Sequence, residues 1–195
     1  MGREFELKFA ATEAVQAAIE EKFGDFERIS METTYFDTPD RALSARHITL
    51  RQRMENGISV CTLKTPTSGL GRGEWDTECG SIEDAIPELC KLSKHPLLPI
   101  LLVSGVERVC GARFLRKAKT VVLPDCTVEI ALDKGVLTGG GRELPLCEVE
   151  VELKSGPEEA AVAFAEALAA EYGLQPEPKS KFKRASQLGE GKFNA

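Results

Sequence analysis

Acidic and basic side chains recur at every second residue along several stretches of this sequence. Residues 4–8, EFELK, put two glutamates and a lysine on one face of a predicted strand. Glu148, Glu150 and Glu152 repeat the alternation near the C-terminus. Like charges on one strand face repel each other, whereas a solvated surface usually mixes signs. The set therefore favours faces that line something, although any one strand alone also fits a solvated outer face.

Basic residues follow the same alternation elsewhere in the chain. Arg51 shares a face with Arg53, Lys64 follows Thr62 at the same spacing, and Arg72 opens a further alternating stretch. Carboxylates bind hard divalent cations such as Mg²⁺ or Mn²⁺, and arginine binds phosphate through paired donors. A cavity that carries both kinds of group suits a metal–polyphosphate complex. From the pattern alone, a charged sheet surface remains the alternative.

The elements that would position these residues are mostly strands. After the first strand, β-branched and aromatic runs bounded by turn residues predict strands at 26–38, 47–54, 58–65, 71–80, 112–123, 127–137 and 144–154. Helices are predicted at 12–22, 81–92 and 156–172, with a short one at 100–103. About eight sequential strands indicate a mainly antiparallel β (α+β) fold, as a sheet or a barrel. If the helices cover the outside of a closed barrel, the charged faces point inward.

Composition sets further bounds on the kind of protein. The 195 residues predict one domain, 1–195, with a basic, proline-punctuated tail at 175–195. The net charge of −6 gives no reason to expect nucleic acid as a partner. Six cysteines without a CxxC pair, beside two histidines, argue against a zinc site. Without an apolar leader or a membrane-spanning run, the sequence predicts a cytoplasmic protein with reduced thiols and no membrane partner.

The stretch at 4–8 matches the ExExK signature of the CYTH superfamily, the triphosphate tunnel metalloenzymes. Motifs that resemble the family's follow in order: YFDTPDRAL (35–43), LRQR (50–53), TLKT (62–65), GRGEWDTE (71–78), FLRKAK (114–119), VEIALDKG (128–135), EVEVELKSG (148–156) and KSKFKRA (179–185). This ordered set spans nearly the whole chain. The GLGRGEWDTE block and the SK pair near the C-terminus resemble most the bacterial inorganic triphosphatase branch.

The resemblance implies an eight-stranded antiparallel barrel that forms a charged tunnel with helices outside. It implies that Mg²⁺ or Mn²⁺ is bound by Glu4, Glu6, Glu148, Glu150 and Glu152, with Asp133 as a weaker candidate. It implies that the triphosphate is held by Lys8, Arg51, Arg53, Lys64, Arg72, Arg116 and Lys181. Arg113 stays an alternative to Arg116, because the two have opposite parity and the strand register is open. The expected catalytic residues are Glu4, Glu6 and Lys8.

The implied activity is metal-dependent hydrolysis of a triphosphate, with inorganic tripolyphosphate as the first choice and pyrophosphate and phosphate as products. The alternatives are a thiamine or nucleoside triphosphatase and an adenylyl cyclase. Cyclase members often carry His-Phe shortly before ExExK, and only Met1, Gly2 and Arg3 precede it here. A non-catalytic polyphosphate-binding module is disfavoured because it could dispense with the acidic set. The expected partner is a small polyanionic substrate, and a homodimer stays open.

Other residues of the motifs are expected to serve the structure. His47 is expected in a loop rather than in catalysis, and Trp75 in the core or on the outer face. Tyr35 is expected to pack the barrel, and Asp37 to close a turn. Glu74 is expected to position an arginine rather than to bind metal.

Overall fold

The computed structural model describes residues 2–67 and 72–191. Its strands are β1 (Gly2–Glu4), β2 (Glu6–Ala10), β3 (Glu27–Asp37), β4 (Thr49–Glu55), β5 (Ile58–Pro66), β6 (Arg72–Glu78), β7 (Glu107–Val122), β8 (Thr127–Gly139), β9 (Arg142–Ser155) and β10 (Gln175–Pro176). Its helices are α1 (Glu13–Phe23), α2 (Ile82–Ser93), α3 (Leu98–Leu101), α4 (Glu158–Tyr172) and α5 (Lys181–Gly189), with short turns η1 (Ser44–Arg46) and η2 (Leu102–Ser104). The predicted mainly antiparallel α+β fold is confirmed.

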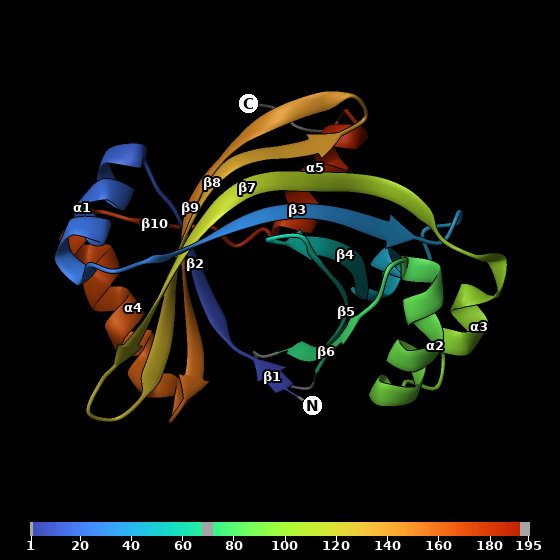
Figure 1. Ribbon diagram of the computed structural model, residues 1–195, viewed down its shortest axis with the longest axis horizontal. Coiled ribbons are helices and arrows are strands. Elements are labelled where there is room, and N and C mark those ends of the chain that lie inside the picture. The colour runs from blue at the N-terminus through green and yellow to red at the C-terminus, as the bar shows by residue number, and fades with distance from the viewer. Residues whose placement is uncertain (1, 68–71, 192–195) are drawn as a thin grey trace.

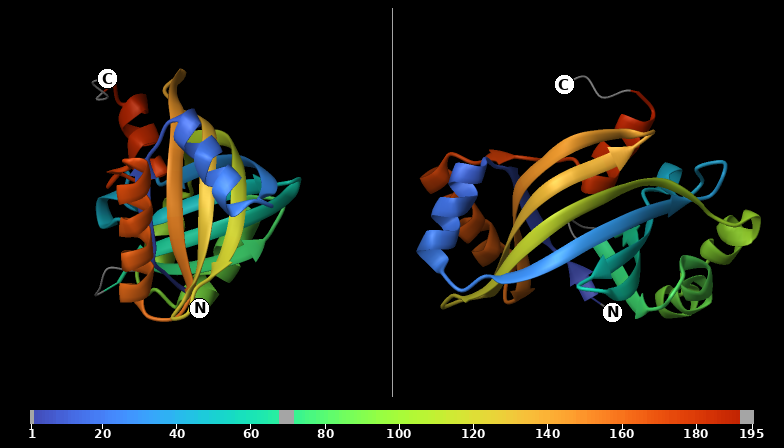
Figure 2. Two further views of the ribbon diagram at one scale, coloured as in Figure 1. Left: turned by 90° about the vertical axis from the view of Figure 1, so that its left-hand side faces the viewer. Right: turned by 45° about the horizontal axis from the view of Figure 1, so that its top comes forward.

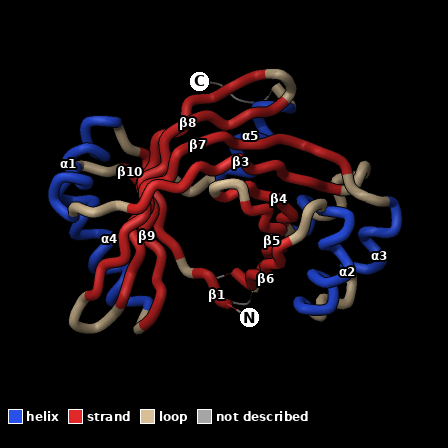
Figure 3. Tube along the Cα trace, viewed as in Figure 1, coloured by secondary structure: helices blue, strands red, loops and turns tan. Residues whose placement is uncertain are grey.

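The sheet closes on itself through the N-terminal segment. The strand order is β1-β6-β5-β4-β3-β7-β8-β9-β2-β10, and β1 and β2 are one segment interrupted at Phe5. The first half pairs with β6, where Glu4 lies opposite Arg72, and the second half pairs with β9, where Glu6 lies opposite Glu152. Counting β1 and β2 as one strand, the ring has eight strands, and β10 adds two residues beside β2. Figures 1 and 3 show this ring of strands around an open centre.

Helices cover the outside of the ring at two places. α1 and α4 lie at one side, and α2 and α3 at the opposite side (Figure 1). One apolar cluster joins the strand residues Phe9, Ile130 and Val151 to Ala165 and Leu168 of α4. Because the apolar faces of these strands pack outward under helices, their charged faces are left to point into the ring, as expected for a closed barrel.

The second outer cluster packs α2 against β4 and β5. Ile82, Ala85 and Leu89 of the helix contact the buried Leu50 and Leu63 of the strands, and Trp75 packs against the same cluster. The predicted helix starts are confirmed: the Thr12 hydroxyl accepts a hydrogen bond from the N–H of Val15 at α1, and Ser81 caps α2 through Asp84.

The proline-punctuated tail contains an element that was not predicted. Ser180 caps the helix α5, and the Phe182 ring packs 5.3 Å from the ring of Tyr35. Figure 2 shows α5 (red) beneath the β8–β9 hairpin. A Cβ atom at Gly139 would collide with the carbonyl oxygen of Ala185, so the glycines at the hairpin tip allow the helix to approach. The tail is therefore an integral part of the barrel's inner packing.

The loop after β3 is held by a buried carboxylate. Asp37 accepts hydrogen bonds from the N–H groups of Thr38 (2.8 Å), Leu43 (2.9 Å) and Ser44 (3.1 Å). The loop ends at His47, whose left-handed backbone (φ 57°) terminates η1. The expected turn role of Asp37 and the expected loop position of His47 are both confirmed.

In the described ranges, no helix has the length and apolar character needed to cross a membrane. The six cysteines are free thiols.

Candidate active site

A cavity of about 940 Å³ occupies the centre of the barrel. Its walls carry eleven of the twelve residues predicted for the site: Glu4, Glu6, Lys8, Arg51, Arg53, Lys64, Arg72, Arg116, Glu150, Glu152 and Lys181. The twelfth, Glu148, lies behind them and is fully buried. The barrel thus brings together side chains from the first strand, the middle strands, β9 and α5.

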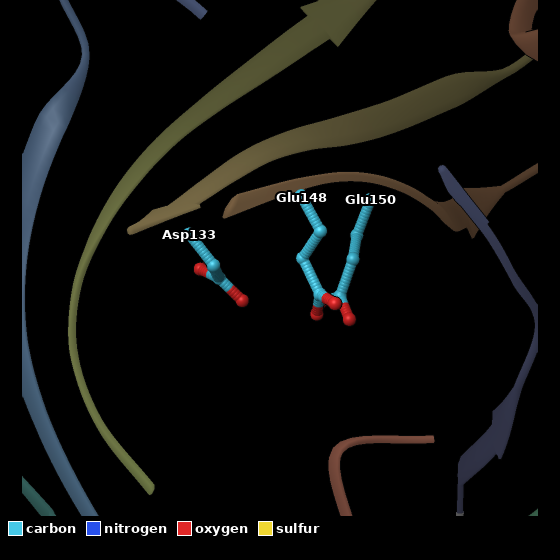
Figure 4. Close-up of side chains that lie close together, drawn as sticks. All are labelled: Asp133, Glu148 and Glu150. Atoms are coloured by element: carbon cyan, nitrogen blue, oxygen red, sulfur yellow. The ribbon is translucent and has the colours of Figure 1, made fainter. Parts of the chain in front are cut away.

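Three carboxylates meet on the wall formed by β8 and β9. Asp133 lies directly opposite Glu148 in the strand register, and Glu150 follows two residues later on the same face. Each offers an oxygen atom, and these oxygens lie within 4.8 Å of one another. Figure 4 shows the carboxylates of Glu148 and Glu150 side by side, with Asp133 directed toward them. We call these three residues the acidic trio.

Three cations neutralise the acidic trio. The ammonium group of Lys181 lies 2.7 Å from Asp133 and 2.8 Å from Glu150, and it also contacts Glu148. Arg116 donates to both oxygens of Asp133 at 2.8 and 2.7 Å, and to Glu150 at 2.5 Å. Arg184 contacts the second oxygen of Glu148. Three buried negative charges therefore face three positive ones, which removes most of the cost of burying them.

These contacts decide the protonation of the trio. Burial alone would raise the pKa of Glu150, but the charges of Lys181 and Arg116 hold that pKa well below its ordinary value. Burial would lower the pKa of Lys181, but the carboxylates around it raise that pKa above its usual range. Burial would also raise the pKa of Asp133, but Lys181 and Arg116 lower it, whereas burial raises the pKa of Glu148 despite its contacts with Lys181 and Arg184.

The opposite wall carries a second group of paired charges. Glu4 contacts Lys64, and Lys64 lies 3.3 Å from Glu74, which in turn lies 3.3 Å from Arg51. Glu74 therefore holds an arginine and a lysine in place, as expected for a positioning carboxylate. The chain of contacts links β1, β4, β5 and β6 across the cavity wall.

Glu6 is the predicted acidic residue with the weakest pairing. Its nearest cation, Lys8, lies 3.6 Å away, and its side chain is 31% exposed toward the cavity. The negative charge of Glu150 and then burial raise the pKa of the Glu6 carboxyl above its ordinary value. Additional positive charge between Glu6 and Glu150 would therefore stabilise the ionised form of Glu6.

Arg53 projects into the cavity from a fixed position. Its Nε atom donates to the hydroxyl of Thr33 at 3.1 Å, and its Nη1 atom lies 3.4 Å from Glu55. Burial, together with the positive charges of Arg51 and Arg116, lowers the pKa of Arg53 to about 10. A cationic side chain that is buried near other cations is well placed to bind an anion.

The structure decides between the two arginines of β7. Arg116 lines the cavity, whereas Arg113 is exposed on the outside and pairs with Glu143 at 2.5 Å. Arg72 lies at the rim, where its guanidinium donates to the carbonyl oxygen of His47 at 2.8 Å and to the Thr49 hydroxyl at 3.3 Å.

The donor set fits a hard divalent cation. Carboxylate oxygens are the ligands that Mg²⁺ and Mn²⁺ prefer, and the acidic trio supplies three of them close together. An ion bound by Glu148 or Glu150 would share these carboxylates with Lys181, whereas the cation beside Glu6, Lys8, lies 3.6 Å from it. A metal bound between Glu6 and Glu150 would offset the repulsion between these two carboxylates.

Two residues contribute to the site beyond the main set of twelve. Asp133, a weaker candidate from the sequence, is fully buried at the centre of the acidic trio. Arg184 was not predicted to belong to the site, although it lies three residues after Lys181. Residues at this spacing share one face of a helix, so a prediction of α5 would have placed Arg184 beside Lys181.

Comparisons with known proteins agree with this geometry. The family model of the CYTH domain matches residues 2–186. An inorganic triphosphatase from Haemophilus influenzae is 30% identical over 202 residues, which cover 99% of this chain and 57% of the relative. The chain thus spans about 57% of the length of that curated relative.

Solved structures share the fold. A candidate adenylyl cyclase from Hippeastrum with a dominant triphosphatase activity superposes with a TM-score of 0.66 at 17% identity, covering 99% of this chain and 98% of the other. A protein from Pyrococcus horikoshii superposes with a TM-score of 0.63 at 23% identity, covering 92% and 96%. Given the domain match over nearly its whole length, the chain belongs to the CYTH family.

Proposed function

We propose that this chain is a metal-dependent hydrolase that cleaves inorganic tripolyphosphate to pyrophosphate and phosphate, in the cytoplasm, where its free cysteines stay reduced. The observation that carries the proposal is the convergence of cationic side chains and carboxylates on one cavity inside the barrel. The similarity to an inorganic triphosphatase supports the same substrate class.

The cations of the cavity would bind the substrate. The proposed set is Lys8, Arg51, Arg53, Lys64, Arg72 and Arg116, with Lys181 placed at the α5 end. Phosphoryl transfer gains mainly from positioning and from neutralisation of charge on the transferred group and the leaving group. Arg53, Arg51 and Arg72 are held by Thr33, Glu74 and the His47 carbonyl respectively, so these three arginines need little reorganisation when substrate binds.

The carboxylates would hold Mg²⁺ or Mn²⁺. The proposed ligands are Glu4, Glu6, Glu148, Glu150 and Glu152, now joined by Asp133. When bound, the metal would polarise phosphate oxygens and an attacking water molecule. The carboxylates would hold the metal beside the substrate, which the cations of the cavity would bind.

A phosphate-release screen tests the proposal directly. The protein is assayed with tripolyphosphate, thiamine triphosphate and ATP, each with Mg²⁺, with Mn²⁺ and with excess chelator. We expect the fastest release from tripolyphosphate, no release with chelator, and recovery when the metal is returned. Cyclic AMP from ATP would support a cyclase instead, and tight tripolyphosphate binding without turnover would support a binding module.

Arg53→Lys is expected to lower kcat/KM for tripolyphosphate by on the order of tenfold or more, because an ammonium keeps the charge but loses the paired donors. Arg113→Lys is the matched control, since Arg113 lies on β7 of the same barrel but faces outward. Steady-state kinetics of both variants measure the difference. Equal activities of the two variants would remove Arg53 from the substrate-binding set.

A further inference from the structure

One buried polar side chain outside the cavity contacts the backbone of the acidic trio. Gln16 belongs to α1 and is 7% exposed. Its side-chain nitrogen Nε2 donates to the carbonyl oxygen of Asp133 at 3.0 Å and to that of Glu148 at 2.9 Å. The amide thus bridges β8 and β9 at the two residues that face each other in the register.

The bridge lies next to the point where β2 leaves β9. β2 pairs with β9 as far as Ala10 opposite Glu148, the N–H of Ala11 donates to the carbonyl oxygen of Cys147, and the chain then turns into α1. β8 continues to pair with β9 on both sides of Asp133 and Glu148. Gln16 therefore adds two hydrogen bonds to carbonyl oxygens of the β8–β9 ladder, and these bonds tie α1 to both strands at the level of the acidic trio.

Two ion pairs fix α1 on either side of this bridge. Glu13, one turn before Gln16, lies 2.7 Å from Lys134 of β8, and Glu20, one turn after it, contacts Lys117 of β7. These pairs are more exposed than the amide. They orient the helix across β7 and β8, and Gln16 is its buried polar anchor.

We propose that Gln16 is a positioning residue for the acidic trio: by fixing the paired backbones of Asp133 and Glu148 against α1, it sets where their carboxylates meet Lys181 and Arg184. The catalytic consequence rests on the proposed function, whereas the geometric consequence does not. Glutamine suits the role because one neutral amide carries two N–H donors. Methionine would fill a similar volume without donors.

The test compares Gln16→Met with two variants of Ile19, which is fully buried on the same helix and contacts no residue of the trio by hydrogen bond. Ile19→Val and Ile19→Ala span a range of stability losses, measured by urea unfolding, that brackets the loss in Gln16→Met. The first readout is the NMR signal of the Lys181 ammonium group, which lies 5.2 Å from the centre of the Phe114 ring and touches all three carboxylates. The second is kcat with tripolyphosphate and Mg²⁺.

We expect Gln16→Met to shift the Lys181 signal and to lower kcat by about 10- to 100-fold, the usual effect of losing a group that orients a metal ligand. The Ile19 variants should change neither. The same changes in an Ile19 variant of equal stability would reduce Gln16 to a purely structural role, and an unshifted Lys181 signal would overturn the positioning. A shifted signal with unchanged kcat would overturn the catalytic consequence alone. If the wild type hydrolyses no triphosphate but the signal shifts, the proposed function fails and the positioning stands.

Discussion

Lys181→Met is expected to lower the free energy of unfolding by about 3–5 kcal/mol, the cost of removing one partner from a buried charge network. The ammonium group touches all three carboxylates of the acidic trio, and both Lys181 and the trio are buried. Without it, Arg116 and Arg184 face three negative charges. Methionine retains most of the side-chain volume, so loss of charge and not a cavity dominates the effect.

Lys183→Met is the matched control for that measurement. Lys183 lies two residues along the same helix and is exposed, so the same substitution removes a charge that water already solvates. Urea unfolding of both variants gives the comparison, and the control should change stability by less than about 0.5 kcal/mol. Similar values for the two variants would show that α5 does not carry a charge that the trio needs.

Glu6→Gln is expected to lower kcat for tripolyphosphate by about 10²- to 10³-fold, because it removes a proposed metal ligand while keeping the shape of the side chain. The carboxylate lies near Glu150 on the neighbouring strand β9, whose charge repels it, and the cation beside it, Lys8, is 3.6 Å away. In the metal-free protein, removing the charge of Glu6 should therefore relieve its repulsion with Glu150. The variant should fold at least as well as the wild type and bind metal less tightly.

Glu32→Gln serves as the control for Glu6→Gln, since Glu32 is an exposed glutamate on the outer face of β3. Steady-state kinetics over a range of Mg²⁺ concentrations measure both variants, and urea unfolding confirms that each is folded. If Glu6→Gln keeps the full activity of the wild type at all metal concentrations, Glu6 is not a ligand and the proposed metal set is wrong.

The direction of the charged faces could be predicted because it follows from the two-residue period of a strand. Once Phe9 and Val151 are buried under helices, Lys8 and Glu150 must face the other way. The helix caps at Thr12 and Ser81 could be predicted for a similar reason. In each cap, the hydroxyl accepts a hydrogen bond from an N–H group only three residues later in the chain.

The contacts that could not be predicted all depend on pairing between distant segments. The choice between Arg113 and Arg116 is set by the register of β7, and one residue of slip would exchange them. The helix α5 was missed because prolines precede it and most of its stability comes from packing inside the barrel. The contact of Gln16 with two carbonyl oxygens leaves no pattern in the sequence.

The interrupted N-terminal segment also determines when the cavity comes into existence. Residues 2–10 are synthesised well before their second partner strand, β9, which ends at Ser155, so the segment keeps unpaired backbone groups until β9 has been made. Pairings between such distant segments form slowly and late. Glu4, Glu6 and Lys8 meet the other charged residues only when the ring closes, so affinity for a polyanion should arise in one step at the end of folding.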